Sequence, residues 1–181
     1  LYNRILYRYH PTESERAAAI QMLPYFASER FNHQRADDRS SMEFTYVRRP
    51  DYYAAFNAGP RRVNQQVFGL GLLWHPEGGI MMSSQTENSS ASSNRGLSWG
   101  TKPASGGRVY ENGDVLPSYK LNGQSFQPAV GAADLANGDL EMSYSLGSAG
   151  TKTVAFTETG VTVTVYHQGE FEERIPLAIG P

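Results

Sequence analysis

The sequence predicts a mainly β protein, an antiparallel β-sandwich (supersandwich-like) preceded by a short helical segment. Two observations carry this prediction. Apolar and polar residues alternate through much of the second half of the chain, and Asn-Gly pairs recur between the alternating runs. Alternation gives each strand one buried and one solvated face, and Asn-Gly supplies the positive φ angles of tight hairpin turns. A chain of 181 residues can bury a core without disulfides, and it contains no cysteine.

The helical segment lies near the start of the chain. Thr12 and Glu15 fit a capping box, in which hydroxyl and carboxylate satisfy the free N–H groups of a new helix. Residues 17–23 are strong helix formers, and Pro24 should end or kink the helix. The polar residues 32–41 then predict a connector.

The sandwich is expected to begin at residue 42, where the hydrophobic period changes to two. The predicted division is therefore residues 1–41 as helical segment and connector, and residues 42–181 as the β-sandwich domain. Residues 67–74 form a long apolar run that ends at a turn around His75. Residues 87–106 are rich in Ser, Asn and Gly and predict a long loop.

The second half contains the most regular strand patterns. Residues 140–146 and 161–165 alternate between apolar and polar side chains, which predicts half-buried strands. Three hairpin turns are predicted at Asn112-Gly113, Asn122-Gly123 and Asn137-Gly138.

Composition argues against several classes of partner. The net charge of −2 gives no support for nucleic-acid binding, which needs a basic patch. No apolar stretch approaches the length of a membrane span. The chain begins at Leu1 without a methionine or a signal peptide, so we expect a fragment of a longer protein.

The sequence contains no motif that identifies a catalytic reaction. His75 and Glu77 are too few for a zinc site, and Asp139 and Glu141 are expected on a solvated strand face. β-Elimination of a uronate needs a base, such as Tyr, and a group that neutralises the carboxylate, such as Arg or Asn. Side chains of these common types occur close together in the sequence at Tyr52, Tyr53, Asn57, Arg61 and Arg62. No catalytic, metal or cofactor residue is therefore assigned.

Glycan binding is the best-supported role for individual side chains. Trp99 follows the Ser-rich loop and is expected to stack on a sugar ring, with Arg95 nearby to bind hydroxyls or a carboxylate. Trp74 and His75 are the other candidates, and Trp74 is expected to act mainly in stability. The alternative for Trp99 is that it fills the core beneath the loop.

From Tyr52 onward the chain resembles the β-sandwich region that follows the helical toroid in heparinase II/III-like polysaccharide lyases. The similar segments are residues 52–59 (YYAAFNAG), 68–79 (FGLGLLWHPEGG), 99–101, 110–114 and 169–177. The resemblance implies an accessory, non-catalytic domain of a secreted or periplasmic bacterial protein. It also implies a polysaccharide and an upstream helical domain as partners. The family's catalytic residues come largely from the toroid, so the isolated chain is expected to be inactive.

Two other functions remain open. The chain is alternatively a free-standing carbohydrate-binding module, which an exposed aromatic row would favour. It is otherwise a small mutarotase-like sugar enzyme, which a concave sheet with His75 facing a carboxylate would favour.

Overall fold

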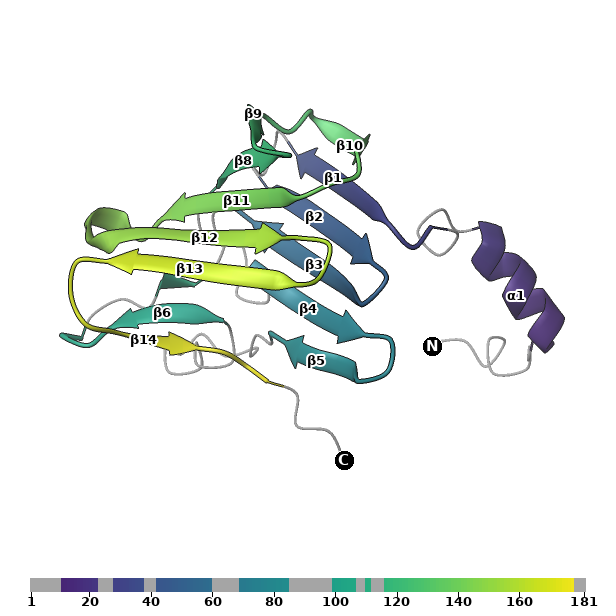
Figure 1. The fold of residues 1–181 in the computed structure, drawn as a ribbon, viewed down its shortest axis with the longest axis horizontal. Helices are drawn as coiled ribbons and strands as arrows, with labels where there is room; N and C mark the ends of the chain where they lie inside the picture. Colours follow the sequence, from purple (N-terminus) through teal and green to yellow (C-terminus); the bar gives the residue numbers. More distant parts are fainter. Residues whose placement is uncertain are drawn as a thin grey trace, which may run out of the picture.

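The computed structural model describes residues 11–22, 28–37, 42–59, 69–84, 99–106, 110–111 and 116–177. These residues form one α-helix, a short 3-10 helix and three antiparallel sheets (Figure 1). The predicted mainly β, sandwich-type fold is confirmed.

The six-stranded sheet has the order β10-β1-β2-β3-β4-β5. Its strands are β1 (Phe31–Asp37), β2 (Met42–Arg49), β3 (Tyr52–Ala58), β4 (Gly69–His75), β5 (Gly79–Ser83) and β10 (Gly131–Leu135). The five-stranded sheet, in the order β13-β12-β11-β8-β9, contains β8 (Ser118–Leu121), β9 (Gln124–Phe126), β11 (Leu140–Ser145), β12 (Gly150–Phe156) and β13 (Val161–His167). The three-stranded sheet is formed by β6 (Gly100–Pro103), β7 (Tyr110–Glu111) and β14 (Phe171–Arg174). The 3-10 helix Gly147–Ala149 joins β11 to β12.

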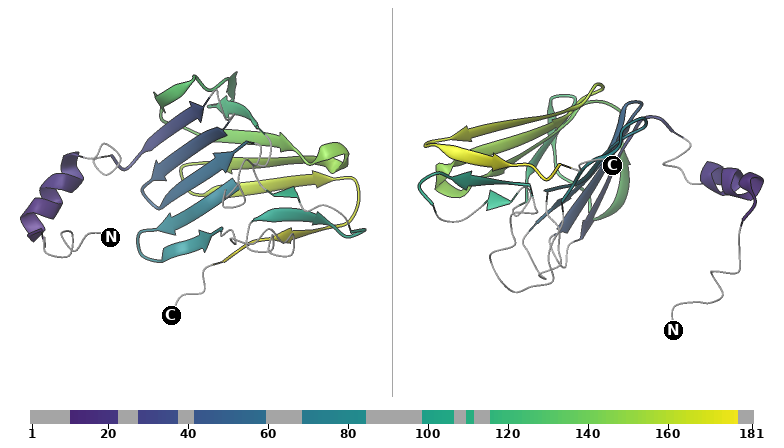
Figure 2. Two further views of the ribbon diagram at one scale, coloured as in Figure 1. Left: turned by 180° about the vertical axis from the view of Figure 1, so that it is seen from behind. Right: turned by 90° about the horizontal axis from the view of Figure 1, so that it is seen from below.

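The core lies between the six-stranded sheet and the layer that faces it (Figure 2). Phe56 of β3 is central, with its ring centroid 6.3 Å from that of Phe156 and 6.5 Å from that of Tyr144. In β11 the expected alternation buries Leu140 and Met142 together with Tyr144. The contact between Phe56 and Phe156 is edge-to-face, and a contact of this kind adds about 0.5–1.5 kcal/mol to the energy of burial.

The Asn-Gly pairs form different connections. Asn122 and Gly123 make the predicted hairpin between β8 and β9, with φ angles of 50° and 78°. The prediction for Asn137-Gly138 is wrong, because that pair carries the chain from β10 to β11, which belong to different sheets. Asn112-Gly113 lies outside the described residues.

Strand β1 occupies a stretch for which the sequence predicts a connector. It pairs with β2 along its full length and with β10, so the six-stranded sheet begins before residue 42. Its core-facing side chains are Asn32 and Gln34, which are 0% and 3% exposed. Because the buried side chains of β1 are polar, its sequence does not alternate between apolar and polar residues. The sequence pattern therefore did not predict this strand. The predicted loop over residues 87–106 is likewise interrupted by β6.

Helix α1 (Glu13–Met22) has the predicted capping box. The backbone N–H of Thr12 donates to Glu15 Oε2 at 2.8 Å, and the Glu15 N–H donates to Thr12 Oγ1 at 3.3 Å. Figure 2 shows α1 extending away from the sheets, and no residue of α1 is buried. Within the described part of the chain, no helix is long and apolar enough to cross a membrane.

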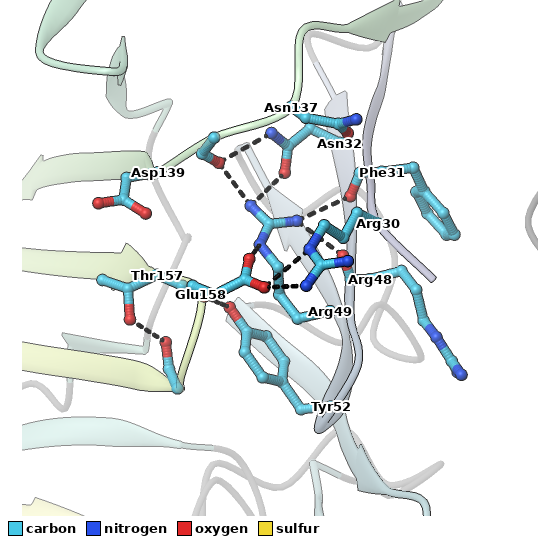
Figure 3. A network of polar contacts seen from close by, with 12 residues as sticks. Arg30, Phe31, Asn32, Arg48, Arg49, Tyr52, Asn137, Asp139, Thr157 and Glu158 are labelled. Carbon is cyan, nitrogen blue, oxygen red and sulfur yellow. Dashed lines mark hydrogen bonds and ion pairs between the residues drawn. The ribbon is translucent and has the colours of Figure 1, made fainter. Parts of the chain in front are cut away.

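A buried arginine joins the two layers at one end of the sandwich (Figure 3). Arg49 at the end of β2 is 1% exposed. Its guanidinium donates hydrogen bonds to the carbonyls of Phe31, Arg48 and Gly138 and to Asn32 Oδ1. Nearby, the Tyr52 hydroxyl donates to the carbonyl of Thr157 at 2.6 Å, and burial raises the pKa of Tyr52 to about 12. These contacts hold β1, β2 and the turns beside β11 and β12 in one arrangement.

Candidate functional site: an aromatic and basic groove

The outer face of the six-stranded sheet, opposite the core, carries a groove with a volume of about 620 Å³. We call it the outer groove. It is lined by Phe31, His33, Arg35, Tyr46, Arg48, Tyr53, Trp74 and Ala132. Successive side chains of a strand point to opposite faces of the sheet. In β1 to β3 the side chains that point away from the core form the floor of the groove, and their sequence neighbours are buried.

Sheet register places four of the lining residues in one row across the strands. Phe31 of β1 pairs with Arg48 of β2, which pairs with Tyr53 of β3, which pairs with Trp74 of β4. The Phe31 and Tyr53 ring centroids are 6.4 Å apart. The guanidinium carbon of Arg48 lies 5.3 Å from the Trp74 ring centroid. The row therefore combines aromatic faces with a fixed positive charge.

Arg48 is the cation best placed to meet a ligand in this row. Its Nε is buried and has no hydrogen-bond partner among the described residues. A buried donor without a partner is costly, and because this Nε is closed to solvent, a ligand would meet the Arg48 guanidinium through its charge and not through this atom. The aromatic lining and the guanidinium together favour a ligand that has both an apolar face and a negative group.

A second row contributes the polar side of the groove. His33 of β1 stands opposite Asp134 of β10 and Tyr46 of β2. His33 Nδ1 lies 2.8 Å from Asp134 Oδ1, and the His33 and Tyr46 ring centroids are 6.1 Å apart. Asp134 fixes the orientation of the His33 ring, while exposed Arg35 adds a second guanidinium.

Another polar cluster is enclosed in the core and has a different character. Lys152 of β12 is fully buried, and its Nζ donates to Glu173 of β14 and, at 2.9 Å, to Thr101 of β6. Thr101 Oγ1 donates to Glu173 Oε2 at 2.7 Å, and the Trp99 indole N–H donates to Glu173 Oε1. Burial lowers the pKa of Lys152, while the Glu173 carboxylate opposes that shift. Lys152 is fully enclosed while the Glu173 side chain is 20% exposed, and the cluster joins the five- and three-stranded sheets.

A carboxyl and a phenol meet at the edge of the core. The Tyr119 hydroxyl of β8 donates to Glu43 Oε2 of β2 at 2.5 Å. Burial raises the pKa of Glu43, and the hydrogen bond from Tyr119 partly offsets this effect. Burial also raises the pKa of Tyr119. The pair is a contact between the two layers.

The sequence-predicted glycan residues do not lie together. Trp99 is 5% exposed and its indole is bonded to Glu173, so it packs in the core and presents no open face. Trp74 lines the outer groove. His75 Nδ1 accepts hydrogen bonds from the backbone N–H groups of Glu77 and Gly78, as a structural turn requires. Arg95 lies outside the described residues.

The weaker catalytic candidates are also separated by the fold. Tyr52 faces the core while Tyr53 faces the outer groove, and residues 61–62 lie outside the described residues. Glu141 pairs with Lys120 at 3.0 Å. No group of three or more His, Asp or Glu side chains in the described segments is arranged to hold a metal ion.

Sequence reasoning missed Phe31, His33 and Arg35 because it missed β1. Tyr46 and Arg48 lie on a stretch with strand pattern, but only register places Arg48 in the row of Trp74 and Tyr46 in the row of His33. Comparisons with family models, with curated proteins and with solved structures found no match to this chain. The outer groove is therefore the feature of this chain that indicates a function.

Proposed function

We propose that this domain binds an acidic polysaccharide through the outer groove. The observation that carries the proposal is the guanidinium of Arg48 held over Trp74, beside Tyr53 and Phe31. Aromatic rings offer an apolar face that suits the C–H side of a sugar ring. Arginine is the side chain best suited to bind carboxylates through charge-assisted hydrogen bonds.

The proposed role in the parent protein is that of an accessory, non-catalytic β-sandwich. The parent would be a secreted or periplasmic polysaccharide lyase-like protein with an upstream helical domain. The resemblance of residues 52–59 and 68–79 to such proteins supports this role, as does helix α1, which has no buried residue of its own. A free-standing carbohydrate-binding module would use the same groove in the same way.

Titration calorimetry with polygalacturonate, alginate, heparin and hyaluronan tests the binding proposal, with neutral dextran as the control ligand. We expect binding to at least one acidic polymer, weakened by added salt. Arg48→Met should weaken binding about tenfold, which corresponds to about 1.4 kcal/mol. Arg16→Met removes an exposed arginine from α1 and should have no effect. Absence of binding to all four polymers, or binding unchanged in Arg48→Met, would refute the proposal.

The non-catalytic role has its own test. Unsaturated products of uronate β-elimination absorb in the ultraviolet, and the purified domain should produce none from the four acidic polymers. Product formation that disappears in Tyr53→Phe would contradict the non-catalytic role while leaving the binding site in place.

A mutarotase-like activity is a second candidate, and the contact between His33 and Asp134 is what favours it. A histidine oriented by a carboxylate is suited to proton transfer at a sugar's anomeric centre. Polarimetry of freshly dissolved glucose and galactose tests this candidate. Mutarotation that the wild-type domain accelerates and the His33→Gln variant does not would support this candidate. Mutarotation at the uncatalysed rate in the presence of the wild-type domain would eliminate it.

A further inference from the structure

The outer groove runs across the strands. Its lining residues come from β10, β1, β2, β3 and β4, which are consecutive neighbours in the sheet. Adjacent strands lie about 4.8 Å apart, so the backbone positions of Ala132 and Trp74 are separated by about 19 Å across the sheet. This span is longer than a single sugar ring.

The two ends of the groove differ in chemistry. At the β4 end, Trp74 and Tyr53 supply aromatic surface under the guanidinium of Arg48. At the β10 end, the polar groups are His33, held by Asp134, and exposed Arg35. Arg48 reaches toward β4, whereas Arg35 stands on β1 beside Ala132 of β10. The two guanidinium groups therefore belong to different parts of the outer groove.

We infer that the outer groove binds an oligosaccharide segment of several linked rings that crosses the strands from β10 to β4. This inference rests on the proposed polysaccharide-binding function and adds separate binding positions at the two ends. Rings of the segment pack at the Tyr53 and Trp74 end, beside the Arg48 guanidinium that already lies over the Trp74 ring, and another part of the same segment meets Arg35 and His33. A monosaccharide fills only one of these positions.

Calorimetry with fragments of one to six residues, prepared from each of the four acidic polymers, tests the inference. Affinity should rise with length, and a tetrasaccharide should bind at least tenfold more tightly than the monosaccharide of the same series. Trp74→Ala and Arg35→Gln should each reduce tetrasaccharide affinity toward that of a disaccharide, because each removes one end of the groove.

Tyr166→Ala is the matched control, because Tyr166 is an exposed aromatic residue on β13 of the other layer. It should leave tetrasaccharide binding unchanged, and thermal unfolding should show that all three variants are folded. Equal affinity for monosaccharide and tetrasaccharide, or an Arg35→Gln variant that binds like the wild type, would overturn the inference and leave polysaccharide binding intact. Failure of every fragment and every polymer to bind would instead refute the proposed function and the inference with it.

Discussion

Arg48 and Trp74 are in contact, with the guanidinium carbon 5.3 Å from the ring centroid, although β3 separates the strands that carry them. The Arg48 side chain therefore extends across the sheet surface instead of into solvent. Its position is set by the register of three strands and by the aromatic surface on β3 and β4. A cation held in this way is preorganised for a ligand.

The contact between Arg48 and Trp74 should be measurable in the free protein. Cation–π contacts contribute about 0.5–1 kcal/mol at exposed sites. A double-mutant cycle with Arg48→Met and Trp74→Ala, followed by urea unfolding, should give a coupling of that size. A parallel cycle that combines Arg48→Met with Tyr166→Ala should show additive effects, since Tyr166 lies on the other layer. Additivity in both cycles would show that the contact contributes no stability.

The buried pair of Lys152 and Glu173 should tolerate joint replacement better than the loss of one partner. Lys152→Met leaves the Glu173 carboxylate buried without its cation, and breaking such a pair costs about 3–5 kcal/mol. Lys152→Met with Glu173→Gln removes both charges and keeps an acceptor for the Trp99 indole. We expect the double variant to recover much of the lost free energy of unfolding, as measured in urea. A double variant less stable than Lys152→Met would contradict this account.

Glu43 should make the stability of the domain depend on pH. Because burial raises its pKa in the folded state above the ordinary 4.5, the folded protein holds the proton more tightly than the unfolded chain does. The stability from this protonated form is present below about pH 4.5 and is lost as the pH rises through the folded-state pKa.

Glu43→Gln keeps an acceptor for the Tyr119 hydroxyl and carries no charge. Its stability relative to the wild type should therefore increase as the pH rises from 4 to 8, measured by urea unfolding at each pH. Glu170→Gln, at an exposed position, is the control. A Glu43→Gln difference that stays constant across this range would show that the carboxyl does not control stability.

Arg49→Lys should destabilise the sandwich even though it keeps the positive charge. Lysine cannot reproduce the fork that meets carbonyls of Phe31, Arg48 and Gly138 and the side chain of Asn32. Two lost or unsatisfied buried hydrogen bonds correspond to about 2–4 kcal/mol. Thermal and urea unfolding measure the change, with exposed Arg16→Lys as the control. A stability equal to that of the wild type would show that Arg49 does not join the layers.

The fold class and its most local features follow from the amino-acid sequence. Alternation in β11 and β13 reflects a sheet with one buried face, so it can be recognised without knowing the partner strands. The capping box of Thr12 with Glu15 and the turn at Asn122-Gly123 depend only on neighbours in the chain. A structural feature can be predicted from the sequence where the contacts that form it join residues only a few positions apart.

The position of the candidate site depends on contacts between residues that are far apart in the sequence. Strand β1 buries Asn32, whose amide donates to the carbonyls of Ala136 and Gly138, and Gln34, whose amide nitrogen donates to Thr45 of β2, and no sequence pattern indicates these contacts. Trp99 lies in the core because Glu173, far away in the chain, accepts a hydrogen bond from its indole N–H. Trp74 faces a groove because the register of β1 to β4 brings Phe31, Arg48 and Tyr53 to the same row. The physical reason is the same in each case: long-range pairing, and not local propensity, chooses which face of a strand is covered and which remains open.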